Sequence, residues 1–178
     1  MWSERVLLAV DLLVFVGPAW AQAPHYGLGR TPAPAEIAAW NTDVRADGLG
    51  LPPGHGSVAS GREVFAQRCA ACHGDKGQGG SADRLVGGFG TLSNQNPIKT
   101  VGSYWPYATT LFDFVRRAMP FNAPGTLSDD EIYAVSAYIL ALNGVIADDA
   151  TLGPDNLSHI AMPNRNGFVS EDPRPDVR

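Results

Sequence analysis

The two cysteines of this 178-residue chain, Cys69 and Cys72, are separated by two residues and are followed directly by His73. This C-x-x-C-H spacing is the attachment signature of c-type haem. Two thiols three positions apart on a helical turn can reach the two vinyl groups of one porphyrin, and the next residue then lies under the iron, where its ring nitrogen can bind. We therefore predict one covalently attached haem c, held by Cys69 and Cys72 and ligated by His73.

Two other uses of paired cysteines fit the sequence less well. A thioredoxin-like pair lies near a βαβ pattern, and no such pattern is visible here. A structural zinc site needs four ligands, and no second Cys/His pair follows at the spacing of a zinc finger. Because both thiols are assigned to haem, no disulfide remains, and the two thioether bonds would be the covalent staple of a small exported domain.

A haem that transfers electrons needs a sixth iron ligand, and methionine suits this role because it raises the reduction potential and blocks other ligands. Beyond the N-terminal 21 residues the chain has two methionines, Met119 and Met162. Met119 lies in an expected loop between two helices, and two prolines stiffen that loop, so we predict Met119 as the ligand. Met162, in the tail, fits a core or surface contact. The alternatives are three histidines in the extensions: His25, His55 and His159.

Residues 1–21 have the features of a secretory signal peptide. A short start with one arginine precedes an apolar run and a small-x-small cleavage site that ends at Ala21. The run is much shorter than the ~20 residues of a spanning helix, and Asp11 interrupts it. We therefore expect cleavage after Ala21, export to the periplasm and no stable membrane anchor.

Charge and composition exclude one class of partner. The formal net charge of −5 argues against a nucleic-acid partner, because proteins that bind nucleic acid usually present a basic surface. Apolar residues make up 44% of the chain, which is enough to bury a core. The 20 glycines and 14 prolines predict many turns and loops.

Periodicity and capping signals predict helices and no convincing strand. The best-marked helix starts at the capping box Ser128 to Glu131 and stops at Asn143-Gly144. Gly61 is a poor residue for a helix interior, which predicts that another backbone approaches closely there. The expected helices cover residues 34–40, 58–71, 107–118 and 129–142.

Aromatic and basic side chains near the expected ligand loop have two interpretations. The aromatic residues can pack on the porphyrin or belong to the ordinary core. The arginines can neutralise the haem propionates or remain solvated. The residues concerned are Tyr104, Trp105, Tyr107, Phe112, Phe114, Arg84, Arg116 and Arg117.

The motifs together resemble the class I cytochrome c domain over about residues 57–144. The matching residues are Gly61, Phe65, Cys69-Ala-Ala-Cys-His-Gly74, Met119-Pro120, Leu127-Ser-Asp-Asp-Glu131 and Tyr138. The resemblance implies an all-α fold in which the first and last helices cross where a small residue meets an aromatic one, here Gly61 and Tyr138. We expect this class I cytochrome c fold to carry extended irregular N- and C-terminal segments.

The chain is thereby divided into four expected parts. Residues 1–21 are the signal peptide, and residues 22–56 are a Pro/Gly-rich N-terminal extension. Residues 57–144 are the cytochrome c domain, and residues 145–178 are an irregular C-terminal tail with no clear element. For the N-terminal extension, an ordered wrap over the domain and a partner-binding role remain equally open.

A narrower resemblance includes the extensions. Gly29 to Trp40, Gly50-Leu-Pro-Pro-Gly54 and Met162-Pro-Asn-Arg-Asn-Gly167 look similar to the cytochrome subunit of sulfite and sulfur dehydrogenases. This resemblance implies an electron acceptor for a molybdenum-containing sulfite dehydrogenase, or a sulfur dehydrogenase subunit of the thiosulfate-oxidising Sox system. Some of these relatives carry two haem motifs, whereas this chain has one, so a two-haem relay is not expected.

We therefore expect an electron-transfer protein and not an enzyme, since the sequence offers no nucleophile or general base. Its electrons would come from the sulfite dehydrogenase and pass to a downstream cytochrome or oxidase. One alternative is a general periplasmic shuttle between a respiratory complex and an oxidase, and another is a haem enzyme with an open sixth site. The long extensions favour a dedicated partner, because a shuttle needs little beyond its haem domain.

Overall fold

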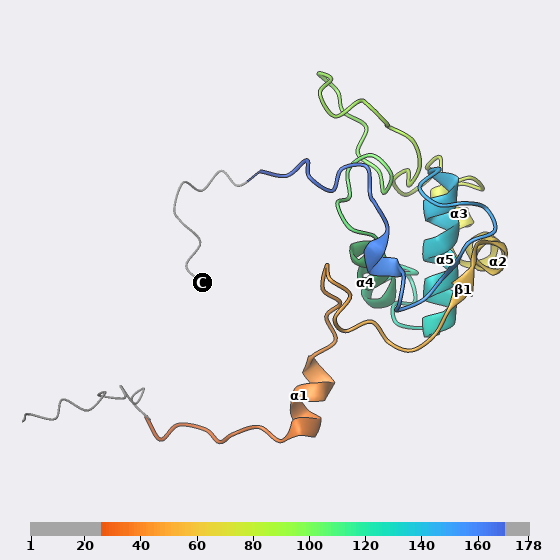
Figure 1. Cartoon of the computed structure of the whole chain (residues 1–178). Coiled ribbons are helices and arrows are strands. Elements are labelled where there is room, and N and C mark those ends of the chain that lie inside the picture. Colours follow the sequence, from red (N-terminus) through yellow and green to blue (C-terminus); the bar gives the residue numbers. More distant parts are fainter. Residues whose placement is uncertain (1–25, 170–178) are drawn as a thin grey trace, which may run out of the picture.

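The computed structural model describes residues 26–169, so the expected signal peptide lies outside the described residues. Three helices form the body: α2 (Val58–Arg68), α4 (Ala108–Ala118) and α5 (Asp129–Leu142). Both α2 and α4 pack against α5, which runs through the middle of the body (Figure 1). The expectation of an all-α class I cytochrome c fold is confirmed. Within residues 26–169 no helix is long and apolar enough to cross a membrane.

Helix α5 begins and ends where the capping signals predict. The Ser128 hydroxyl accepts the Glu131 N–H at 3.3 Å, and the Glu131 carboxylate accepts the Ser128 N–H at 2.8 Å. The hydrogen bonds that the carboxylate accepts from the Ser128 N–H and, at 3.0 Å, from the Ser128 hydroxyl lower the pKa of Glu131. Its charge lies at the positive end of the helix dipole. Every residue from Ile132 to Ala141 is buried, because α5 is apolar on all sides and is covered on all sides.

The crossing of α2 and α5 explains the glycine in α2. A Cβ on Gly61 would overlap the backbone carbonyl of Ala134 and lie 2.9 Å from the Cβ of Tyr138. The rings of Phe65 and Tyr138 meet edge to face, with centroids 5.3 Å apart. Gly61 and Tyr138 therefore form the helix crossing that the family resemblance implies.

The helix expected over residues 58–71 is interrupted, which corrects the sequence analysis. Helix α2 ends at Arg68, and a separate turn, α3 (Ala70–His73), follows. Cys69 lies between them with φ −123° and ψ −39°, outside the helical region. Periodicity does not show this break, because the apolar stripe continues across it. The haem motif consequently forms a turn of its own.

The C-terminal segment contains short elements that the sequence analysis did not predict. Strand β2 (Thr151–Leu152) pairs antiparallel with β1 (Gly56–Ser57), and the 3-10 helix η1 (Leu157–His159) follows. Leu152, Leu157 and Met162 are all buried in the core. A strand of two residues is too short to show alternation, so it leaves no readable pattern.

The N-terminal extension consists of two different parts. We call residues 43–55 the strap and residues 26–42 the arm; the arm contains helix α1 (Pro34–Trp40), at the predicted position. The strap packs against the body, whereas every residue of the arm is exposed and α1 stands apart from the body (Figure 1). Hydrogen bonds to the body hold the strap, among them Val44 N–H to Asp113 (3.2 Å), His55 N–H to Asp130 (2.7 Å) and Tyr133 O–H to the Pro52 carbonyl (2.8 Å).

Candidate haem site

The structure brings Cys69, Cys72 and His73 together on one turn. The Cys69 carbonyl accepts the Cys72 N–H at 3.1 Å and the His73 N–H at 3.0 Å. The Cys69 side chain packs against the core, while Cys72 is exposed. The two thiols are therefore held at a fixed separation, as attachment to a single porphyrin requires.

The imidazole of His73 is already oriented for metal binding. Its Nδ1 lies 2.7 Å from the backbone carbonyl of Asp83, and a carbonyl can only accept, so Nδ1 is the donor. In the neutral ring the lone pair then lies on Nε2, the nitrogen that a metal ion could bind. A hydrogen bond of this kind fixes both the tautomer and the ring angle of a metal ligand. The sequence analysis missed Asp83, because a backbone carbonyl leaves no signal in the residue type.

The loop after the motif folds back on the motif and places the Asp83 carbonyl. The Gly79 N–H donates to the His73 carbonyl at 2.7 Å, and the Ala82 N–H donates to the Cys72 carbonyl at 3.0 Å. Gly77 has φ +68°, a conformation that glycine adopts without strain. The loop is therefore compact and packs against the turn that carries His73.

Asn143 fixes the far end of the same loop, a role that the sequence analysis also missed. Its amide oxygen accepts the Gly87 N–H at 3.1 Å, and its Nδ2 donates to the Leu85 carbonyl at 3.1 Å. A Cβ on Gly102 would overlap this amide, so the chain passes closely over it. The sequence shows Asn143 only as a helix stop, because its partners lie far away along the chain.

Met119 is the residue that directly follows α4, on a different element from the motif. Its side chain is half-buried and packs against the core. Met162, in contrast, is 3% exposed and is part of the core itself, as its interpretation as a core contact predicts. His55 and His159 are exposed, and His25 lies outside the described residues.

The aromatic and basic residues separate into two groups. Phe112 is fully buried against Tyr133, whereas Trp105 and Phe114 form an edge-to-face pair, 5.7 Å between centroids, that solvent reaches. Two of the arginines are engaged in ion pairs: Arg116 with Asp129, and Arg117 with Asp43 and Asp113. Arg84 has no ion-pair partner within residues 26–169.

The donor set and its surroundings fit a haem. The motif supplies two thiol sulfurs and an imidazole nitrogen, and half-exposed Leu85, Trp105 and Met119 offer apolar surface that a porphyrin can cover. Burial, and to a smaller extent Cys72, raises the pKa of the Cys69 thiol to about 11, and a thioether at this position carries no charge to bury. In the described part of the chain, no three His, Cys, Asp or Glu side chains lie close enough together to hold a metal ion.

Comparison with known proteins also indicates a cytochrome c. Residues 56–139 match the sequence family described as cytochrome c oxidase, cbb3-type, subunit III. The crystal structure of the sulfane dehydrogenase SoxCD from Paracoccus pantotrophus contains a chain that is 48% identical, with a TM-score of 0.78, over 83% of this chain and 73% of that chain. The chain belongs to the class I cytochrome c family. Its members bind haem c and transfer electrons.

Curated relatives match about half of this chain. A thiosulfate dehydrogenase of Stutzerimonas stutzeri (strain A1501) is 34% identical over 90 residues, which is 49% of this chain and 28% of the relative. A cbb3-type cytochrome c oxidase subunit CcoP of Azospirillum sp. (strain B510) is 32% identical over 111 residues, 52% of this chain and 33% of the relative. The cytochrome thus spans about a third or less of the curated relatives it matches.

Proposed function

We propose that this chain is a monohaem c-type cytochrome that accepts single electrons from a molybdenum-containing sulfite or sulfur dehydrogenase. The observation that carries the proposal is the likeness to SoxCD, which extends over 83% of the chain. Residues 57–144, the proposed haem domain, are only about half of the chain, so the shared part includes a portion of the extensions. A general shuttle needs no such extensions to hold iron.

In this proposal Cys69 and Cys72 would attach the porphyrin, and His73 and Met119 would bind the iron. The bound haem supplies reversible one-electron chemistry at its iron. The chain contributes the orientation of the ligand: the Asp83 carbonyl orients His73, and the hydrogen bonds of the loop to the motif hold that carbonyl in place. Export after removal of residues 1–21 places the cytochrome in the periplasm, where a downstream cytochrome or oxidase takes the electron.

The choice of Met119 as ligand has its own spectroscopic test. Methionine sulfur bound to ferric haem gives a weak near-infrared absorption band, and the oxidised wild type should show it. Met119→Ala should lose the band, whereas Met162→Ala should keep it, although loss of a buried side chain will lower its stability. Loss of the band in Met162→Ala alone would assign the ligand to the tail instead.

Reduction by the dehydrogenase tests the partner. We expect a purified molybdenum sulfite dehydrogenase from the same cell to reduce the cytochrome when sulfite is added, as followed by the absorbance of the reduced haem. Sulfite without the dehydrogenase, and the dehydrogenase without sulfite, are the controls. If sulfite causes no reduction above these controls, the proposed donor is wrong.

Two other functions are favoured by particular relatives. The cbb3-type family description and the Azospirillum subunit favour electron transfer to an oxidase. The name of the Stutzerimonas relative favours a haem enzyme that oxidises thiosulfate itself. The purified cytochrome, mixed with thiosulfate and no other protein, distinguishes this second case, because only an enzyme would then reduce its own haem.

A further inference from the structure

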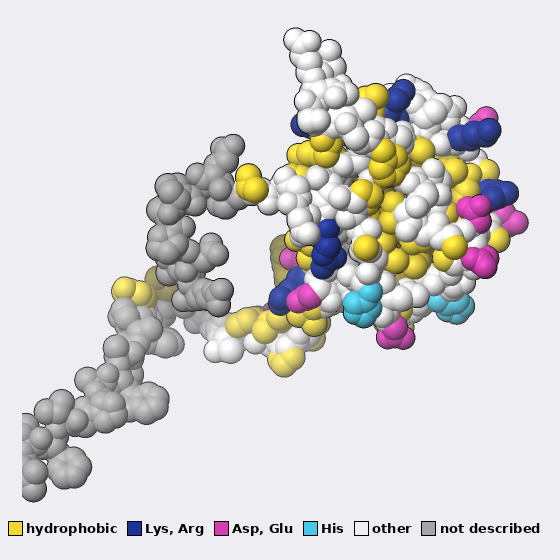
Figure 2. All heavy atoms as spheres, turned by 45° about the horizontal axis from the view of Figure 1, so that its top comes forward, with side chains coloured by type: hydrophobic (Ala, Val, Ile, Leu, Met, Phe, Trp, Pro, Cys, Tyr) yellow, Lys and Arg dark blue, Asp and Glu magenta, His cyan; other side chains and the backbone are white. Residues whose placement is uncertain are grey.

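The arm exposes several large apolar side chains to solvent. All of its residues are exposed, and hydrophobic side chains lie along the part of the chain that leads away from the body (Figure 2). The exposed fractions of its large apolar side chains are 80% for Tyr26, 87% for Leu28, 52% for Ile37 and 87% for Trp40. Clustered exposed apolar side chains mark interaction sites more often than single ones do.

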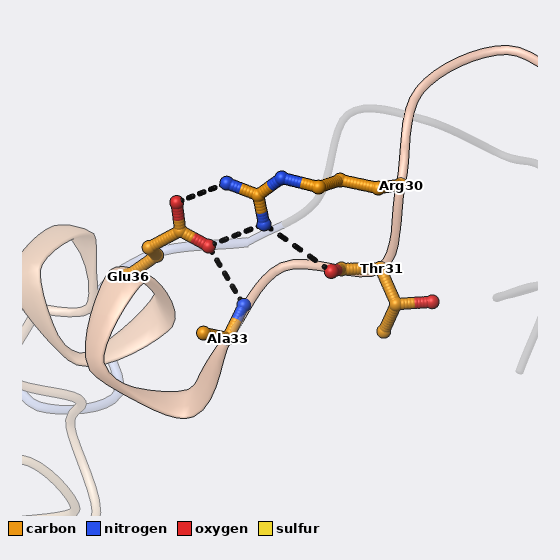
Figure 3. A network of polar contacts seen from close by, with 4 residues as sticks. All are labelled: Arg30, Thr31, Ala33 and Glu36. Atoms are coloured by element: carbon orange, nitrogen blue, oxygen red, sulfur yellow. Dashed lines mark hydrogen bonds and ion pairs between the residues drawn. The ribbon is translucent and has the colours of Figure 1, made fainter.

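The arm has a local structure of its own. The Arg30 guanidinium donates to both carboxylate oxygens of Glu36, at 2.7 and 2.5 Å, and Glu36 also accepts the Ala33 N–H at 2.7 Å (Figure 3). This network ties the segment before α1 to its first turn, where Pro34 suits the helix start. Ile37 and Trp40, three positions apart, line one shallow hollow with Pro32 and are presented on one side.

The arm leaves the body beside the proposed iron ligand. Asp43, the first residue after the arm, pairs with Arg117 at 3.2 Å, and the next N–H, that of Val44, donates to Asp113. Both partners lie in the last two turns of α4, which Met119 follows directly. A protein bound by the arm is therefore held close to the ligand loop, where Phe121 is 87% exposed.

The charges of the arm indicate whether it binds a membrane surface or a partner protein. Arg30 and Glu36 are the charged residues of segment 26–42, and they neutralise each other. A helix that binds an anionic membrane surface needs a basic face, which this segment lacks. A neutral apolar arm suits a partner protein that offers an apolar pocket. The likeness to SoxCD, which extends beyond the haem domain, makes the dehydrogenase the partner in question.

We propose that the arm anchors the molybdenum dehydrogenase, with Trp40 and Ile37 inserted into an apolar pocket on that enzyme and the haem edge held near its electron donor site. This inference rests on the proposed function and deepens it. It also divides the extension: the strap belongs to the fold, and the arm belongs to the interface.

The test compares haem-loaded full-length proteins. The double variant Trp40→Ala with Ile37→Ala removes the two anchors, and Leu49→Ala, which removes a 62% exposed side chain from the strap, is the matched control. We measure the Kd for the dehydrogenase and the rate of sulfite-dependent haem reduction. The double variant should bind at least tenfold more weakly and need more dehydrogenase for half-maximal rate, with an unchanged haem spectrum and an unchanged rate at saturation. Leu49→Ala should match the wild type.

Each contrary outcome has a separate meaning. Equal Kd values for the double variant and the wild type, with the wild type still reduced, overturn the arm inference and leave the proposed function standing. A wild type that the dehydrogenase does not reduce overturns both. If the double variant instead loses a concentration-dependent dimer or binding to anionic phospholipid vesicles, with its Kd for the dehydrogenase unchanged, the arm serves a second copy or a membrane and the inference is wrong.

Discussion

The strap and the arm are neighbours in sequence and similar in composition, yet only the strap is part of the fold. Both are rich in proline and glycine. The strap satisfies its backbone groups on side chains of the body, namely Asp113, Asp130 and Tyr133. The arm satisfies its groups mainly within itself, through the Arg30–Glu36 network. Composition therefore does not decide whether an extension docks; the body must offer partners for its backbone.

The junction between strap and body should be the most sensitive position. A Cβ on Gly56 would overlap the backbone of Ala134 in α5. Gly56 cannot move away from α5 without disturbing the β1–β2 pair. We expect Gly56→Ala to lower the free energy of unfolding by at least about 2 kcal/mol, as overpacking does. The control is Ala35→Gly in the arm, which weakens α1 but should leave the melting temperature of the body unchanged. Similar losses in both variants would show that arm and body fold as one unit.

The next largest loss of stability is expected at Asp113, which holds the strap to α4. Asp113 is 9% exposed and accepts hydrogen bonds from Val44 and Arg117. Asp113→Ala should cost about 1.5–3 kcal/mol, because it removes a charged acceptor and leaves its donors without partners. The matched change in the arm, Glu36→Ala, breaks an exposed ion pair and should cost less than about 1 kcal/mol. Denaturant unfolding measures both, and a larger loss in Glu36→Ala would contradict the division into strap and arm.

The smallest effect is expected at Tyr133, whose hydroxyl donates to Pro52 in the strap. Tyr133→Phe should cost about 1 kcal/mol, the net contribution of one hydrogen bond. Tyr26→Phe in the arm is the control and should cost nothing measurable.

The same tyrosine makes the strap sensitive to alkaline pH. Burial, and then the charge of Asp129, raises the pKa of Tyr133 to about 12. Because the folded state favours the neutral phenol, this contribution is complete below the unfolded pKa near 10 and is lost as pH rises through about 12. The wild type should therefore lose more stability than Tyr133→Phe over this range. If the free energy of unfolding falls with pH in parallel for the two proteins, the Tyr133 phenol is not protected from ionisation in the folded state.

Local signals predicted much of the fold, and contacts distant in sequence account for the rest. The capping box at Ser128 and the apolar periodicity located α4 and α5, and Gly61 correctly indicated a close backbone approach. The break at Cys69 was missed, because backbone torsion at one residue leaves no trace in the pattern. For the candidate site, the C-x-x-C-H spacing indicated the residues that would hold the haem. It did not indicate Asp83 or Asn143, because a loop must close before their partners come near.

Covalent attachment of haem at Cys69 and Cys72 is the claim on which the rest depends, and acid–acetone extraction tests it most directly. The haem of the wild type should remain with the protein after extraction, at one haem per chain. The double variant Cys69→Ala with Cys72→Ala should keep none. Haem that leaves the wild type with the acetone would contradict the assignment of this motif.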